Sequence, residues 1–150
     1  MNYHLCEAIM PYYDEFGQNC TYILLKDGTK EYFKIPTKTY IRKMFYALHI
    51  DPTSLNHWTC DILHKQQGNP LIISQDIIFL PVRIREVIGR TDGCVGYVLN
   101  SSLTHIGDYT LELRCGATLP TRSKANYLLG KQKDARLLHY TYSEYFKAMR

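Results

Sequence analysis

The stretch Cys20–Lys26 (CTYILLK), followed by Asp27-Gly28 and then by Glu31–Ile35 (EYFKI), has the pattern of a β-hairpin. Both flanking segments are rich in β-branched and aromatic residues, which are typical of strands. An Asp-Gly pair favours the backbone of a tight turn between antiparallel strands. This stretch therefore predicts an antiparallel sheet in the first quarter of the chain.

The residues after this hairpin have the periodicity of an amphipathic helix. Pro36-Thr37 opens the segment and Asp51-Pro52 closes it, because the residue before a proline disfavours the helical region. The apolar side chains recur at helical spacing: Ile41, Met44, Phe45 and Leu48. The basic side chains fall away from that stripe: Lys38, Arg42 and Lys43. We expect a helix with one buried face and one basic, exposed face.

Short apolar segments separated by turn residues predict further strands. These are Trp58–His64, Leu71–Ile73, Ile77–Leu80, Cys94–Asn100, Tyr109–Arg114 and Ala117–Leu119. Gln66–Pro70 is predicted to be a loop, and Pro81–Arg90 suits a short helical turn that exposes its arginines.

The last segment of the chain predicts a helix, with Ser123 as its N-cap. Its apolar seam repeats about every 3.5 residues: Leu128, Ala135, Leu138, Tyr142, Tyr145 and Met149. Gly130 lies inside this seam and is a place where the helix could break. We expect residues 123–138 to pack on the sheet and residues 139–150 to pair with a second copy of the chain.

The elements together predict an α+β fold, a mostly antiparallel β body with one early amphipathic helix and a C-terminal helix. The 150 residues suit a single domain, 1–150. The sequence has neither a membrane-length apolar run nor the pattern of a signal peptide. We therefore expect a soluble, cytoplasmic protein with no membrane partner.

The charges are divided unevenly along the chain. Residues 1–82 carry 7 Lys and Arg against 8 Asp and Glu, whereas residues 83–150 carry 11 against 6. A basic second half indicates a polyanionic partner such as nucleic acid, although a solvated helix face has the same composition. The 13 tyrosines leave a similar choice, because they could stack on bases or cover the edge of a core.

The sequence offers little support for an enzyme or a cofactor. The five cysteines lack CxxC spacing, which fits a reducing compartment, and no GxSxG, HExxH, Walker or GxGxxG motif is present. His57, Cys60 and His64 would alternate faces on a strand and lack a fourth ligand, so we predict no zinc site. A Cys–His nucleophile pair stays open, since such partners meet only in the folded chain.

Several segments, taken in order, resemble the ComK family of competence transcription factors of Gram-positive bacteria. They are Ala8–Pro11 with Gly17 and Cys20, Thr37–Thr53, Lys65 with Asn69–Ile73, Ile77–Pro81, Cys94–Val98, Leu111–Gly116 and Leu119–Ser123. The chain departs from the family at Val82, Tyr97 and Cys115, where the family has Thr, Trp and Asn. Nothing matches the family's adaptor-recognition motif, so we do not expect control by that adaptor and its protease. Gly96–Leu138 is also similar to LytTR-type DNA-binding domains.

The resemblance implies a nucleoid-associated activator of competence and DNA-uptake genes. It would bind paired A/T-rich boxes of double-stranded DNA through the minor groove, as a homodimer or higher oligomer, with RNA polymerase as a further candidate partner and no cofactor. The expected DNA-binding residues are Arg122, Ser123, Lys124, Asn126, Arg83, Arg85, Arg90, Lys38, Arg42, Lys43 and Lys131. The alternatives are a LytTR-like output domain, an RNA-binding module, a protein-only regulatory module and, last, a small Cys–His hydrolase.

Overall fold

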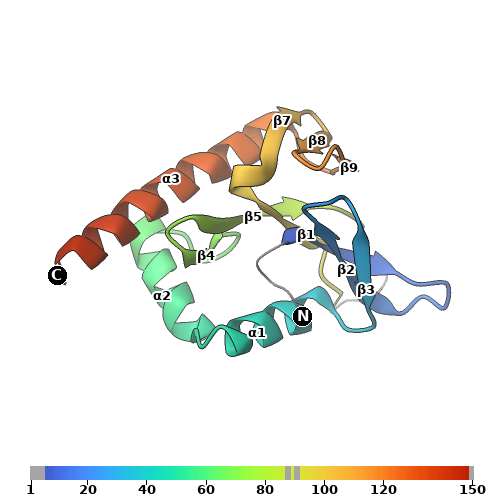
Figure 1. The fold of residues 1–150 in the computed structure, drawn as a ribbon, viewed down its shortest axis with the longest axis horizontal. Coiled ribbons are helices and arrows are strands. Elements are labelled where there is room, and N and C mark those ends of the chain that lie inside the picture. Colours follow the sequence, from blue (N-terminus) through green and yellow to red (C-terminus); the bar gives the residue numbers. More distant parts are fainter. Residues whose placement is uncertain (1–5, 87–88, 90–91, 149–150) are drawn as a thin grey trace.

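The computed structural model describes residues 6–86, 89 and 92–148, and its fold is α+β (Figure 1). The larger sheet has six strands in the order β3-β2-β1-β6-β5-β4. In chain order these are β1 (Cys6–Tyr13), β2 (Asn19–Leu25), β3 (Lys30–Phe33), β4 (Leu71–Ser74), β5 (Ile77–Arg83) and β6 (Val95–Leu99). The smaller sheet contains β7 (Leu103–Gly107), β8 (Thr110–Leu113) and β9 (Thr118–Pro120), and follows a single 3-10 turn, η2 (Asn100–Ser102). The helices are α1 (Thr37–Ala47), α2 (Pro52–Leu63) and α3 (Ala125–Ala148).

The predicted hairpin is confirmed as the antiparallel pair β2 and β3. Its turn is closed by a hydrogen bond from Leu25 N to Thr29 O of 2.8 Å. Gly28 lies in the left-handed region with φ of +90°, a conformation that glycine adopts without steric cost. The Asp27 carboxylate accepts a hydrogen bond from Thr29 N at 2.9 Å, which explains the Asp-Gly preference at this turn.

The six-stranded sheet is covered on both faces (Figure 1). On one face, Ile9 and Phe79 pack with Tyr40 and Met44 of α1. Of the predicted stripe, Met44 and Phe45 are buried, whereas Ile41 and Leu48 are half-buried. On the other face, the sheet packs against the smaller sheet and α3; buried members of this cluster are Met10, Leu80, Val98, Leu111, Leu128, Ala135 and Leu138. Covering both faces accounts for strands that are apolar throughout instead of alternating.

Strand β5 extends through Pro81 to Arg83, so the helical turn predicted at Pro81–Arg90 is wrong for its first part. Proline is tolerated there because β4 pairs β5 only from Ile77 to Phe79, which leaves one edge of the strand without a ladder. Pro81 is aligned with Tyr97 on the other edge. Arg90 lies outside the described residues.

The strand predicted for Trp58–His64 is wrong, because the chain is helical through Leu63 and His64 is the left-handed C-cap of that helix. Asp51 is the N-cap of α2, since its carboxylate accepts from Thr53 N, and Pro52 occupies the first turn, where its missing N–H is not needed. The Asp-Pro pair therefore starts a second helix. The prediction that it closes the helix before it is wrong, because α1 ends at Ala47 and His49 already has a left-handed backbone with φ of +58°. The partly buried residues Leu55, Trp58 and Ile62 then follow at helical spacing and face the core.

Helix α3 is continuous through Gly130 and begins at Ala125, so Ser123 is not its N-cap. The carboxylate of Asp108, from the turn between β7 and β8, accepts a hydrogen bond from Ala125 N at 2.8 Å. The Ser123 carbonyl instead accepts from Tyr109 N at 3.0 Å. Past Leu138, the helix still contacts its own chain, because the Tyr142 ring meets the Trp58 ring edge-on with centroids 6.1 Å apart.

Replacing Asp108 by alanine is expected to destabilise the fold by about 1 kcal/mol, because the first turn of α3 loses both a cap and a favourable charge. Urea denaturation of the variant measures this loss. Asp108→Asn keeps the capping oxygen and should retain most of the stability. An equal loss in both variants, or none in either, would show that Asp108 does not cap α3.

Strand β7 was not predicted from the sequence. Its exposed and half-buried side chains alternate poorly, with exposed Thr104 and His105 next to each other, and it pairs with β8 across an irregular register.

Among the described residues, no helix is both long and apolar enough to cross a membrane.

Candidate nucleic-acid interface

The backbone brings two of the predicted basic segments together. Arg122 N, just after β9, donates a hydrogen bond of 2.8 Å to the carbonyl oxygen of Arg83 at the end of β5. Both side chains are exposed. Two arginines that are 39 positions apart in the sequence therefore share one surface.

Helix α3 adds an aromatic ring and a lysine to this surface. The Lys131 ammonium lies 5.3 Å from the centre of the Tyr127 ring, a cation–π distance. Burial raises the pKa of Tyr127, and the nearby charges of Arg83 and Lys65 partly oppose that rise. Burial also lowers the pKa of Lys131, and the positive charge of Lys65 lowers it further. We call Lys65, Arg83, Arg122, Tyr127 and Lys131 the basic patch. Lys131 is only 8% exposed and lies beneath this surface, so its position does not support the prediction that its side chain contacts DNA.

Two carboxylates partly neutralise the basic patch. Glu86 pairs with Arg122 at 2.7 Å, and Asp134 pairs with Lys65 at 2.7 Å. Glu86 is 80% exposed, so its pair with Arg122 is well solvated and weak. Within the described part of the chain, Arg83 has no ion pair of its own, so a positive excess remains.

Only some of the predicted residues around the first turn of α3 are available to extend the basic patch. Lys124 and Asn126 are exposed, whereas Ser123 is half-buried and its backbone is already hydrogen-bonded. The helix N-terminus donates to Asp108, so a carboxylate of the chain already occupies the place where a phosphate could bind. Lys124 and Asn126 thus remain candidates for DNA contact through their side chains.

Arg85 is held by contacts within the chain. Its guanidinium lies 4.0 Å from the centre of the Tyr13 ring, and it donates to Gly93 O at 3.0 Å and to Asn19 Oδ1 at 2.5 Å. The carboxylate of Asp92 lies close enough to interact electrostatically with the Arg85 guanidinium. Contact with DNA would require these bonds to break, so we do not place Arg85 on the basic patch.

The cations of α1 lie on a neighbouring part of the surface. Lys38 lines a hollow of about 320 Å³ together with Tyr97 and Arg85. Burial raises the pKa of Tyr97, and the nearby Tyr127 raises it further. Arg42 and Lys43 are exposed on the same helix. The three α1 cations therefore form a second group beside the basic patch and not a part of it.

Lys65 was not predicted as a site residue, because the segment before it was predicted to be a strand. Tyr127 was not predicted either, because a lone tyrosine in a helix has no distinguishing pattern. The place of both residues in the basic patch is recognisable only from neighbours that are distant in the sequence and close in the fold. Lys65 lies after the end of α2, while Tyr127 lies on α3. Their contribution depends on the packing of α2 against α3.

Burial disfavours two of the thiols as nucleophiles. Burial raises the pKa of Cys6 to about 12, and it also raises the pKa of Cys115. A raised thiol pKa disfavours the nucleophilic thiolate. Across the described ranges, no three His, Cys, Asp or Glu side chains come together as metal ligands would.

The geometry therefore identifies one exposed, positively charged surface with an aromatic ring in it, at the junction of β5, the β9–α3 connection and α3. Comparison of the chain with protein-family models, with curated proteins and with solved structures finds no match.

Proposed function

We propose that this chain is a DNA-binding transcriptional regulator that recognises A/T-rich duplex DNA through the minor groove with its basic patch. The observation that carries the proposal is the hydrogen bond from Arg122 N to Arg83 O, which holds two exposed arginines on one surface. The ComK-like segments of the sequence support a role in activating competence or DNA-uptake genes.

The physical chemistry of A/T-rich DNA suits this surface. The minor groove of an A-tract is narrow and concentrates negative potential, so it attracts arginine side chains without requiring contacts to base edges. Arg83 and Arg122 would enter the groove. Lys124 would contact the flanking phosphates, which position the protein but carry no sequence information.

Two copies would bind two boxes. A dimer on DNA places equivalent surfaces at half-sites whose separation follows the helical repeat. The distal part of α3 would hold the second copy, since Tyr140 and Tyr145 are 64% and 55% exposed. This is the arrangement that the ComK resemblance leads us to expect.

Titration of the purified protein against three labelled probes tests the proposal: an A/T-rich duplex, a G/C-rich duplex and single-stranded RNA, each at two salt concentrations. We expect the A/T-rich duplex to bind most tightly. If about five phosphates are neutralised, the plot of log affinity against log salt has a slope near −4 to −5. Equal affinity for both duplexes would contradict groove recognition, and a flat salt response would contradict the electrostatic argument.

One cluster favours the alternative of single-stranded RNA. Three tyrosine rings on adjacent strands have centroids within 6.0 Å of one another: Tyr12, Tyr22 and Tyr32. The Lys30 ammonium lies 4.9 Å from the centre of the Tyr22 ring. Aromatic rings on a sheet can stack on unpaired bases. RNA binding at least as tight as that of the A/T duplex, lost in Tyr32→Ala, would favour this alternative.

A further inference from the structure

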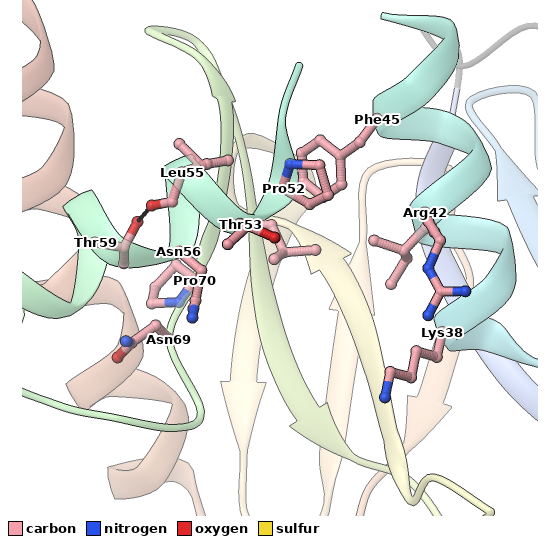
Figure 2. A pocket seen from close by; sticks show the side chains of 12 residues that line it. Lys38, Arg42, Phe45, Pro52, Thr53, Leu55, Asn56, Thr59, Asn69 and Pro70 are labelled. Atoms are coloured by element: carbon pink, nitrogen blue, oxygen red, sulfur yellow. Dashed lines mark hydrogen bonds between the residues drawn. The ribbon is translucent and has the colours of Figure 1, made fainter. Parts of the chain in front are cut away.

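A pocket of about 340 Å³ lies between α1, α2 and the start of β4 (Figure 2). Figure 2 shows Lys38 and Arg42 along one wall, on α1, and Asn56 and Pro70 along the opposite wall. The pocket is separate from the basic patch, none of whose residues lines it. Its volume lies within the range of small-molecule sites, roughly 300–1,000 Å³.

The charge of the pocket selects an anion. Lys38 and Arg42 both line it, and no aspartate or glutamate does. In the part of the chain that the structure describes, neither cation is paired with a carboxylate. Two cations one helical turn apart can hold a single phosphate or carboxylate between them.

The remaining lining of the pocket selects an organic body on that anion. Phe45, Leu55 and Leu71 contribute apolar surface, so a bare inorganic ion would leave most of the pocket unfilled. The exposed side chain of Asn56 adds an amide, whose oxygen accepts from Cys60 Sγ at 3.8 Å and whose two N–H groups can donate to a polar edge. A mostly apolar cavity with a few convergent polar groups is typical of ligand sites.

We propose that this pocket binds a small organic anion of mononucleotide size. Its phosphate lies against Lys38 and Arg42, its flat ring lies against Leu55 and Leu71, and Asn56 hydrogen-bonds to the edge of the ring. The site adjoins the hollow that Tyr97 and Arg85 line, because Lys38 and Ile41 line both. Such a site would give the protein a small-molecule ligand independently of whether it binds DNA.

Isothermal titration of the intact protein with adenosine 5′-monophosphate, adenosine and inorganic phosphate tests this site. We expect saturable binding of the monophosphate, with a Kd below about 1 mM, and weaker binding of both fragments. Arg42→Ala should weaken binding of the monophosphate about tenfold or more. Asn56→Phe, an exposed position on α2, should block the pocket and give a similar loss. DNA affinity is measured in parallel, so the two proposals can fail separately.

Lys43→Ala is the matched control, because Lys43 is exposed on the same helix, carries the same charge and does not line the pocket. This variant should bind the monophosphate like the unmodified protein. An equal loss in Lys43→Ala and Arg42→Ala would overturn the proposal in favour of general charge attraction. No saturable binding of the monophosphate, or equally tight binding of inorganic phosphate, would also overturn it.

Discussion

Replacing Arg122 by alanine is expected to weaken binding of an A/T-rich duplex by about 1–3 kcal/mol, the usual loss for an arginine that contacts DNA directly. The side chain is 51% exposed, and its ion-pair partner Glu86 is itself exposed, so the variant should fold normally. Fluorescence anisotropy with a labelled duplex measures the change. Circular dichroism checks that the variant is folded.

Two further variants separate a specific contact from general charge. Glu86→Gln removes the carboxylate that competes with DNA for Arg122, so it should tighten binding. Arg114→Ala removes an exposed arginine from the turn after β8, away from the basic patch, and should change affinity little. Unchanged affinity in a folded Arg122→Ala protein would remove this residue from the interface.

Replacing Leu138 by alanine is expected to lower the free energy of unfolding by about 2–5 kcal/mol, the usual range for a buried leucine in a well-packed core. Leu138 is fully buried and belongs to the cluster that joins α3 to the six-stranded sheet. The variant loses both apolar burial and packing contacts, because the rigid sheet cannot close the cavity. Urea denaturation, with the slope compared between variants, gives the difference.

Leu137→Ala is the matched control for this loss. Leu137 is 46% exposed on the next position of the same helix, so its truncation removes the same atoms with little burial. We expect a change within about 0.5 kcal/mol, as for most surface substitutions. Equal losses at the two positions would contradict the assignment of the inner face of α3.

The parts of the fold that were predicted correctly are those determined by local patterns. The hairpin of β2 and β3 depends on its own turn residues, and α1 depends on the spacing of its own apolar residues. The Asp51-Pro52 pair was misjudged as the end of α1, which already stops at Ala47, whereas the N-cap hydrogen bond of Asp51 shows that the pair starts α2. Likewise, the cap of α3 comes from Asp108, in a distant turn.

Only the basic composition of the candidate site could be predicted from the sequence. Charge counts identified Arg83, Arg122 and Lys131 separately, but nothing local indicates that β5 ends beside the β9–α3 connection. Arg85 is the same residue type as Arg83 and lies in the same sequence context, yet the Tyr13 ring and Asn19 hold its side chain away from the basic patch. Which arginines remain available is a property of tertiary packing.

The most direct test of the central claim, that one basic surface binds duplex DNA, is a backbone NMR titration of the intact protein with an A/T-rich duplex. We predict that the amide shifts concentrate at Arg83, Arg122, Lys124, Tyr127 and Lys131. Shifts confined to the tyrosine cluster of Tyr12, Tyr22 and Tyr32, none of which belongs to the basic patch, would contradict the claim. A spectrum left unchanged by excess duplex at low salt would contradict it equally.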